Sequence, residues 1–476
     1  MHGDFSRVTF RPGKHYSAVL VQQGRVQLDA DANEQAAIEL HRLRTLAADL
    51  VGRHGGPAAD AGFRIEYRPR SHEVDDLVIG GGRYYVDGIL CDASRPAPGT
   101  AAPADGVGRN DPAPGDATEA TWTYWDQPDA YRDPELAADR LPDTFPYLVY
   151  LKVWERAVGA VEDPDLREVA LGAAMPDTAA RARLIWQVLA LPGGELDAPD
   201  GGAGTIRTAF GAWADQHTAP AGLLAARSQR PDGADDDACL VRPDARYRGP
   251  ENQLYRVEIH HGATAAEGAT FKWSRENGSV VFPVAGFTTA WAELATLGDD
   301  PKLSLDVGDR VEVCDSAYLN RGEPAPLLRV EEVDLPGRRV RLSDQPVPGV
   351  GRVAGRHPFL RRWDHTTPSG AGAPGLAGGA LRLAEGAWLD LEDGVQIYFR
   401  PGAVYRTGDH WIIPARTVTG TVEWPVDTAG DPLLREPAGV HAHYAPLAWV
   451  TGPQSPLDLR FVFSPLAAAV PDPGEN

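Results

Sequence analysis

The feature that most constrains the fold is a continuous apolar run over residues 147–155, Tyr-Leu-Val-Tyr-Leu-Lys-Val-Trp-Glu. Consecutive β-branched and aromatic side chains, without the 3.6-residue period of an amphipathic helix, are typical of a strand that is buried on both faces. Residues 184–191, Leu-Ile-Trp-Gln-Val-Leu-Ala-Leu, have the same character and are the expected partner strand. Together the two runs predict the centre of a β-rich domain.

Glycine and proline favour short strands joined by many turns. The chain has 51 Gly and 41 Pro among 476 residues, which is high for a helical protein. A hydrophobic content of 43% with 12 Trp excludes global disorder. The length predicts about two to four domains. We expect an α+β fold that is predominantly β and multidomain, with short antiparallel sheets, a small β-barrel-like insertion and one long N-terminal helix.

That helix is predicted over residues 31–51. Asp31 is placed to act as its N-cap, and Glu34 has the spacing at which a side chain reaches back to the cap amide. The apolar positions then form one narrow stripe, Ala36, Leu40, Leu43, Ala47 and Leu50. Alternating steps of four and three are typical of a coiled-coil face. We expect the stripe to pack within its own domain, with a neighbouring subunit as the alternative.

Shorter signals divide the rest of the chain. Residues 16–21 read as a strand-like piece, and turn dipeptides at 87–88, 277–278 and 393–394 predict β-hairpins. Residues 192–237 are rich in Gly, Ala and Asp, and their acidic end is expected to be a solvated loop. The expected division is 1–92, an N-terminal docking module with the helix and a hairpin; 93–146, a Pro/Gly-rich excursion; 147–300, a central β-rich domain; 301–350, the small β-barrel-like insertion; and 351–476, a C-terminal β-rich domain.

The net charge and the cysteine pattern restrict the classes of binding partner and the cellular compartment that we expect. A formal net charge of -21 argues against a general binder of nucleic acid or anionic membranes. Cys91, Cys239 and Cys314 are widely spaced and show no pairing or metal-ligand pattern, which indicates a reducing compartment. We find no N-terminal signal core and no apolar run long enough to span a bilayer, so synthesis and folding are expected in the cytoplasm.

Three groups of residues invite a chemical interpretation. Asp29, Asp31 and Asn33 resemble the start of a calcium loop, but Glu34 and Leu40 replace the Gly and Glu that an EF-hand requires. The candidates for a zinc site are histidines without an HExxH motif or Cys-rich partner: His441 and His443, with His260, His261 or His410 as a third ligand.

The third group could serve glycoside hydrolysis. Asp390 and Glu392 share a predicted strand face near Trp388, but the adjacent Asp-Gly turn accounts for them equally well. No serine-hydrolase or P-loop motif occurs in the sequence. We therefore assign no catalytic, cofactor-binding or metal-binding residues and expect a protein that is not an enzyme.

Several segments resemble an uncharacterised bacterial family, a large domain of unknown function associated with contractile injection systems and phage-tail-like particles. The matching pieces are GDFSR at 3–7, HYSAVLVQQGRVQLDADANEQ at 15–35, YLVYLKVWER at 147–156, REVAL at 167–171, TFKWSRENGSVVFPV at 270–284, LEDGVQIYF at 391–399, GDHWIIPAR at 408–416 and HYAPLAWV at 443–450. They run collinearly along the chain. One departure is Ala32, where relatives commonly carry Trp.

The resemblance implies a structural role in assembly. It implies a baseplate-, spike- or fibre-associated protein whose partners are other subunits of the particle, with a homo-oligomer as a further expectation. After cytoplasmic assembly, such a protein could be released as part of an extracellular particle. A target-recognition or carbohydrate-binding protein of the particle is the alternative, and a glycan hydrolase is the third interpretation.

Overall fold

The computed structural model describes residues 1–69, 75–95, 121–172, 175–196, 201–219, 222–229, 246–297, 300, 302–367 and 374–466. Its central sheet confirms the pairing expected from the two apolar runs. β7 (Tyr147–Val158) and β8 (Arg181–Pro192) pair antiparallel along their full length. β24 (His443–Val450) lies on the other side of β7, and β25 (Leu457–Asp458) follows it, giving the order β25-β24-β7-β8.

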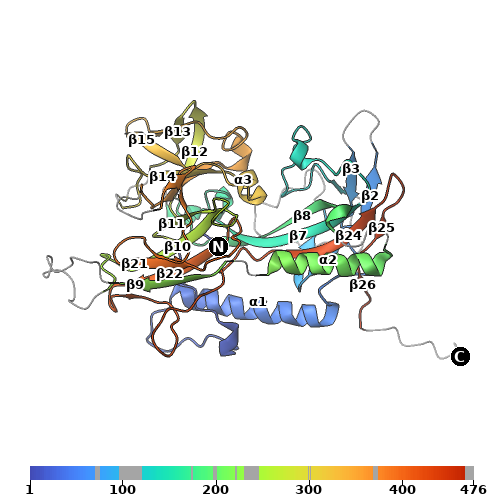
Figure 1. Ribbon diagram of the computed structural model, residues 1–476, viewed down its shortest axis with the longest axis horizontal. Helices are drawn as coiled ribbons and strands as arrows, with labels where there is room; N and C mark the ends of the chain where they lie inside the picture. Colours follow the sequence, from blue (N-terminus) through green and yellow to red (C-terminus); the bar gives the residue numbers. More distant parts are fainter. Residues whose placement is uncertain are drawn as a thin grey trace.

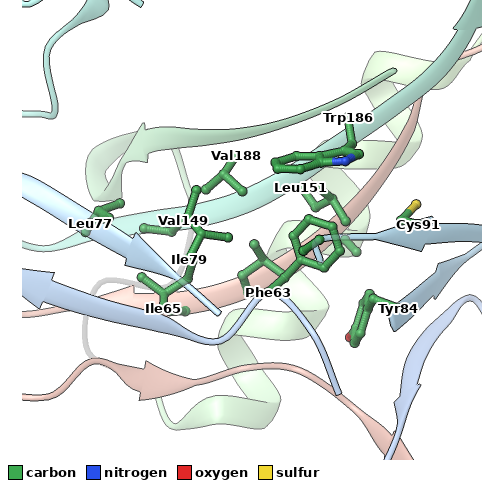
Figure 2. Packing of buried hydrophobic residues seen from close by; sticks show 14 of the residues in the cluster. Phe63, Ile65, Leu77, Ile79, Tyr84, Cys91, Val149, Leu151, Trp186 and Val188 are labelled. Carbon is green, nitrogen blue, oxygen red and sulfur yellow. The ribbon is translucent and has the colours of Figure 1, made fainter. Parts of the chain in front are cut away.

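Both faces of β7 are covered, which explains its uninterrupted apolar sequence. On one face Val149 and Leu151 enter a core that also contains Phe63 and Trp186, as Figure 2 shows. The Phe63 and Trp186 rings meet edge to face, with centroids 5.1 Å apart. On the other face the sheet packs against α2 (Ala203–Thr218), mainly through Tyr150. The alternating side chains of β7 therefore serve two separate cores.

Helix α2 was not expected from the sequence. It lies within residues 192–237, a region rich in Gly, Ala and Asp for which we predicted no helix. Its buried residues are Ile206, Phe210 and Ala214, spaced four apart. This spacing gives a single helical stripe that covers the β24–β7 sheet. Small residues around the stripe mask its amphipathic pattern in the sequence.

A second body consists of a six-stranded and a three-stranded sheet. The six-stranded sheet has the order β18 (Leu376–Ala377), β19 (Ala380–Arg382), β11 (Thr270–Ser274), β10 (Gln253–His261), β22 (His410–Arg416) and β23 (Thr421–Val422). The three-stranded sheet has the order β20 (Trp388–Asp390), β21 (Val395–Phe399) and β9 (Leu224–Ser228). Their facing side chains form one core, which includes Tyr255, Phe271, Phe399 and Trp411.

Six further strands close into a barrel. They are β12 (Val281–Thr288), β13 (Trp291–Leu294), β16 (Arg339–Leu342), β15 (Leu328–Asp334), β14 (Arg310–Cys314) and β17 (Phe359–Trp363), in spatial order. α3 (Ser316–Arg321) follows β14, and Asp315 caps it by accepting from the Tyr318 amide at 2.9 Å. Three of the six strands lie in the predicted insertion 301–350, while β12, β13 and β17 lie outside it.

The remaining elements are short. One sheet has the order β26 (Val462–Phe463), β1 (His54–Pro57), β4 (Arg83–Val86) and β5 (Ile89–Asp92), and another has β2 (Ile65–Arg68), β3 (Asp76–Ile79) and β6 (Trp122–Thr123). The long helix is α1 (Asp29–Val51), and the 3-10 helices are η1 (Pro12–Lys14), η2 (Ala137–Asp139), η3 (Pro164–Leu166), η4 (Val169–Leu171), η5 (Gly193–Glu195) and η7 (Ala354–Arg356). Hairpins at 87–88 and 393–394 are confirmed by the pairs β4–β5 and β20–β21.

The hairpin expected at 277–278 is wrong. Asn277 and Gly278 do form a left-handed turn, with φ of 50° and 66°, but the strands on either side of it do not pair with each other. β11 enters the six-stranded sheet and β12 enters the barrel. The Asn277 side chain donates to the carbonyls of Met1 and Gly3 at 3.1 and 2.9 Å. The turn therefore connects two bodies and holds the first residues of the chain.

The sheets cross the segment boundaries that the sequence suggested. β24 pairs with β7, β22 with β10, β21 with β9 and β26 with β1, so strands from the last part of the chain complete sheets begun much earlier. In Figure 1 the barrel lies above the six-stranded sheet, the β7–β8–β24 sheet extends to the other side, and α1 runs along the bottom of the molecule.

Charged side chains join the six-stranded sheet to the barrel. Lys272 of β11 lies between Glu258 of β10 and Glu312 of β14, with Nζ 3.3 Å from Glu258 Oε1 and 2.7 Å from Glu312 Oε1. All three residues are at most 6% exposed. Trp363 of β17 donates its indole N–H to Glu312 at 3.0 Å, and Lys272 Nζ lies 4.4 Å from the centroid of that ring. One buried lysine thus connects both bodies.

The surrounding cations keep both carboxylates ionised. Burial alone would raise the pKa of the Glu312 carboxyl, but Lys272 and Arg361 outweigh burial and lower this pKa to about 2. The pKa of Glu258 also lies well below its usual range, because Arg256 and Lys272 outweigh the effect of burial. Since the unfolded pKa of a glutamate is about 4.3, this stabilisation is complete above that pH and is lost as the pH falls toward 2.

We predict that Lys272→Met lowers the free energy of unfolding by about 3–5 kcal/mol, because two buried carboxylates lose a shared cation. Lys302→Met is the matched control. Lys302 also contacts two glutamates, Glu251 and Glu276, but is 41% exposed, so its loss should cost less than about 1 kcal/mol. Urea denaturation at pH 7 measures both. Equal losses in the two variants would contradict the role assigned to Lys272.

Candidate functional site

Many large apolar side chains of α1 and of the chain that precedes it are exposed to solvent. The leucines of α1 are solvent-exposed: Leu40 43%, Leu43 62%, Leu46 57% and Leu50 64%. Large apolar residues of the preceding arm, residues 15–28, are exposed as well: Tyr16 57%, Leu20 83%, Val21 69%, Val26 84% and Leu28 46%. We call the four leucines the leucine stripe. The expected packing of the helical stripe within its own domain is therefore wrong for its leucine positions.

The opposite side of α1 is attached to the body mainly by polar contacts. Arg44 forms a bidentate pair with Glu155 of β7, at 3.0 and 2.6 Å. Ile38 is the one large apolar residue of α1 that is fully buried, at 1% exposure. The Arg44 carbonyl also faces Gly88 so closely that an added Cβ would lie 2.0 Å from it. These contacts fix the rotation of the helix, and in that rotation the leucines face solvent.

Helix α1 begins two residues earlier than the sequence indicated. Its N-cap is Leu28, and Asp31 stands at the third helical position, where its carboxylate accepts from the Leu28 amide at 3.2 Å. The side chain of Asp29 accepts from the amide and the hydroxyl of Ser6, at 2.9 and 2.5 Å. Asp31 as N-cap is thus wrong, and these carboxylates serve the helix terminus and the arm.

The arm has no strand partner among the described residues and turns at residues 23–24, where the Arg25 amide donates to the Gln22 carbonyl at 3.3 Å, so the strand expected at 16–21 is wrong. It is tied to α1 by a few polar contacts. The Val19 amide donates to Gln35 at 2.7 Å, and before the arm the Thr9 hydroxyl donates to Glu34 at 2.6 Å. After Val19 the large apolar side chains Leu20, Val21 and Val26 project into solvent, so the backbone there is available for pairing.

The histidine candidates do not assemble. His443 Nδ1 lies 2.8 Å from Asp87 Oδ2, and His410 Nδ1 lies 3.1 Å from the Gly408 carbonyl. His260 is buried on β10, and His261 is exposed at the end of that strand. In the part of the chain that the structure describes, no group of three His, Cys, Asp or Glu side chains is arranged to hold a metal ion.

The carboxylate pair considered for glycoside hydrolysis is held in separate contacts. Glu392 accepts both ends of the Arg275 guanidinium at 2.6 Å and the Tyr255 hydroxyl at 2.9 Å. Asp390 accepts from Gln396 at 2.7 Å. The face of Trp388, the proposed sugar platform, is covered by Arg227 at 4.0 Å from the ring centroid. Glu392 is therefore committed to an ion pair.

Cysteine positions fit the expectation of buried thiols where they are described. Cys91 and Cys314 are free and buried, and burial raises the pKa of the Cys91 thiol to about 12. Such a thiol is unreactive at neutral pH. Cys239 lies outside the described residues. No described helix combines the length and the apolar character that crossing a bilayer requires.

One buried carboxyl, that of Asp409, is only partly compensated by its surroundings. Asp409, within the motif GDHWIIPAR, is 7% exposed, and its Oδ2 atom has no hydrogen-bond partner among the described residues. Burial raises its pKa to about 7, against the opposing effect of Arg406. The native state therefore holds a neutral Asp409 in mild acid and bears an unfavourable buried charge above neutrality.

We predict that Asp409→Asn stabilises the fold at pH 8 by about 2–4 kcal/mol, because the amide removes the buried charge. The gain should shrink as the pH falls through 7 and vanish near the unfolded pKa of about 3.9. Free energies of unfolding measured from pH 4 to 8 provide the test. Asp390→Asn, an exposed control, should show no such pH dependence, and a constant gain for Asp409→Asn would contradict the assignment.

We predict that Leu43→Ala and Ile38→Ala differ sharply in stability, although both remove comparable side chains from α1. Leu43 is exposed, so its loss should change the free energy of unfolding by less than about 0.5 kcal/mol. Ile38 is buried, and its loss should cost about 2–4 kcal/mol. Urea denaturation at low protein concentration measures both. A large, concentration-independent cost for Leu43→Ala would place the leucine stripe inside the monomer core.

Sequence comparison adds a family but no function. A model of a family of unknown function, DUF6519, matches residues 1–201 and 202–454. No curated protein and no solved structure matches the chain significantly. The two matched ranges include both α1 with its arm and the sheets that carry it. The chain therefore belongs to the family of unknown function DUF6519.

Proposed function

We propose that this protein is a non-enzymatic structural subunit that docks to a neighbouring subunit through the leucine stripe and the arm. The observation that carries the proposal is the exposure of four leucines on a helix whose rotation is fixed by other contacts. Exposed apolar patches of this kind mark protein interaction sites. The arm lies beside the helix and extends the same apolar surface.

The size of the surface supports joint use of helix and arm. The stripe spans about 11 residues of α1, from Leu40 to Leu50, or about 16 Å at 1.5 Å per residue. A strip of that length and about 10 Å width offers only about 160 Å², whereas a stable interface buries about 800 Å² on each partner. The arm, residues 15–28 with a turn at 23–24, carries further exposed apolar side chains and supplies additional area.

The two parts provide different kinds of contact. The leucine stripe presents apolar side chains at helical spacing, as helix-in-groove recognition requires. The arm presents a backbone without a strand partner, which can add a strand to the edge of a partner's sheet. Because Asn277 holds Met1 and Gly3 and the arm runs into α1, the chain is held near the body on both sides of the arm before docking.

The identity of the assembly rests on the resemblance of the chain's segments to proteins of contractile injection systems and phage-tail-like particles. We propose a position at the baseplate, spike or fibre of such a particle, with cytoplasmic assembly and release as part of the extracellular particle. A target-recognition or glycan-binding role is the alternative outcome of the test below.

We predict that Leu43→Gln, Leu46→Gln and Leu50→Gln together abolish incorporation into the particle and leave the fold intact. The matched control replaces three exposed apolar residues of the barrel region, Val307, Leu335 and Val353, by Gln. Circular dichroism and urea denaturation check folding, and immunoblots of purified particles measure incorporation. The stripe variant should be lost from particles, while the control should be incorporated normally. Normal incorporation of the stripe variant would overturn the docking proposal.

Cryo-EM of particles with and without the protein separates the alternatives. Loss or misassembly of the baseplate supports a structural subunit. Intact particles that fail only to adhere to their target support recognition instead. Glycan turnover that disappears with Asp390→Asn and Glu392→Gln would replace the non-enzymatic proposal by a hydrolase.

A further inference from the structure

A small pocket at the C-terminal end of α1 has a polar lining made of hydrogen-bond donors. It has a volume of about 190 Å³, and its polar residues include Arg53, His54, Arg207 and Thr208. No acidic side chain is among the described residues that line it. Two arginines border the pocket: Arg207, and Arg53, whose Nε lies 4.0 Å from Asp87 Oδ1.

Arg207 is held in a fixed orientation. Its Nε donates to the Leu459 carbonyl at 2.8 Å, and its guanidinium lies 4.5 Å from the centroid of the Phe461 ring. Nη2 donates to the Arg460 carbonyl at 3.4 Å. The carbonyl contacts orient the planar group without neutralising it, because they are dipoles and carry no net charge. Its positive charge is therefore available to a ligand.

Arg53 contributes a second cation that is only weakly engaged. It follows α1 directly and pairs with Asp215 of α2 at 2.9 Å. The two side chains are 59% and 63% exposed, so the ion pair contributes little to the stability of the fold. An anion entering the pocket can therefore compete with Asp215 for the Arg53 guanidinium.

The neutral imidazole of His54 adds an N–H donor. The Phe461 amide donates to the Tyr84 hydroxyl at 3.1 Å, and His54 Nδ1 lies 3.2 Å from the same oxygen. Because Tyr84 is fully buried, its hydroxyl proton must go to His54 Nδ1. Burial and the charge of Arg53 lower the pKa of His54 to about 4, so the ring is neutral. The remaining ring proton is then on Nε2.

We propose that this pocket binds an oxyanion, a carboxylate or a phosphate group. Two guanidinium groups and an imidazole N–H supply the donors that such a group requires, while the Thr208 hydroxyl, also in the lining, donates to the Gly204 carbonyl at 3.0 Å. Phe210 and Phe461 provide apolar walls that strengthen these interactions by excluding water. The volume corresponds to about six water molecules, so the pocket admits one such group with a small organic body.

Histidine side-chain NMR of the full-length protein tests the site. The His54 ring resonances are followed while inorganic phosphate is added in one arm and N-acetylglutamate N-methylamide, which mimics an acidic side chain, in another. Saturable shifts with a Kd of about 1 mM are expected. A response to phosphate identifies a site for a free anion, and a response to the glutamate compound alone identifies a site for a protein carboxylate. No saturable shift in either arm overturns the proposal.

Variants assign the response to the two arginines. Arg53→Gln and Arg207→Gln should each weaken binding by about tenfold or more, since each removes a charge-assisted contact. Arg329→Gln is the matched control, because Arg329 is 52% exposed and ion-paired to Glu331 on the distant barrel. The Arg329→Gln variant should bind the added anion with unchanged affinity. Arg53→Gln keeps the carbonyl contacts of Arg207, so undiminished binding in that variant overturns the site even if Arg207→Gln fails to fold. The result is independent of the docking role of the leucine stripe.

Discussion

The arrangement of the molecule depends on the contact in which Lys272 bridges Glu258 and Glu312. The three residues come from a sheet strand, its neighbour and a barrel strand, so the contact sets the distance and orientation between the two bodies. Buried ion pairs add little stability compared with apolar packing, but removing one partner is costly. Such a contact acts mainly by excluding other arrangements, because any displacement of the barrel would leave a carboxylate or an ammonium without its counterion. The apolar cores on either side can then remain separate.

The same cluster connects the fold to the proposed docking surface. Asn277, at the turn between β11 and β12, binds the carbonyls of Met1 and Gly3, and His2 lies against Glu258. The start of the chain is thus fixed at the junction of sheet and barrel, close to β10 in Figure 1. From there it leaves the body, passes through the exposed arm and returns as α1. The arm is consequently a loop of chain with two fixed ends, which lowers the entropy lost when it pairs with a partner.

The sequence predicted those elements whose pattern has a local cause. The run at 147–155 is apolar because both faces of β7 are buried, and the Asp-Gly turn at 393–394 gives a hairpin because its strands are neighbours. The Asn-Gly turn at 277–278 has the same local chemistry, yet its strands separate because β11 pairs with β10 and β19, whereas β12 pairs with β13 and β17. Helix α2 was missed because small residues dilute its stripe. The donors of the pocket come from distant segments, with Arg53 after α1 and Arg207 on α2. Their spacing in the sequence therefore does not indicate that they line the same pocket.

The orientation of α1 is the reverse of that of an ordinary surface helix, whose most apolar stripe faces the core. Here Arg44 faces inward to Glu155, and the leucines face outward. A rotation that buried the leucines would break this bidentate pair and carry Ile38 away from its buried position, and Gly88 leaves no space for a Cβ beside the Arg44 carbonyl. Polar and steric contacts therefore determine which face α1 exposes. Since Arg53 follows the same helix, the rotation that presents the leucine stripe also sets the position of the pocket.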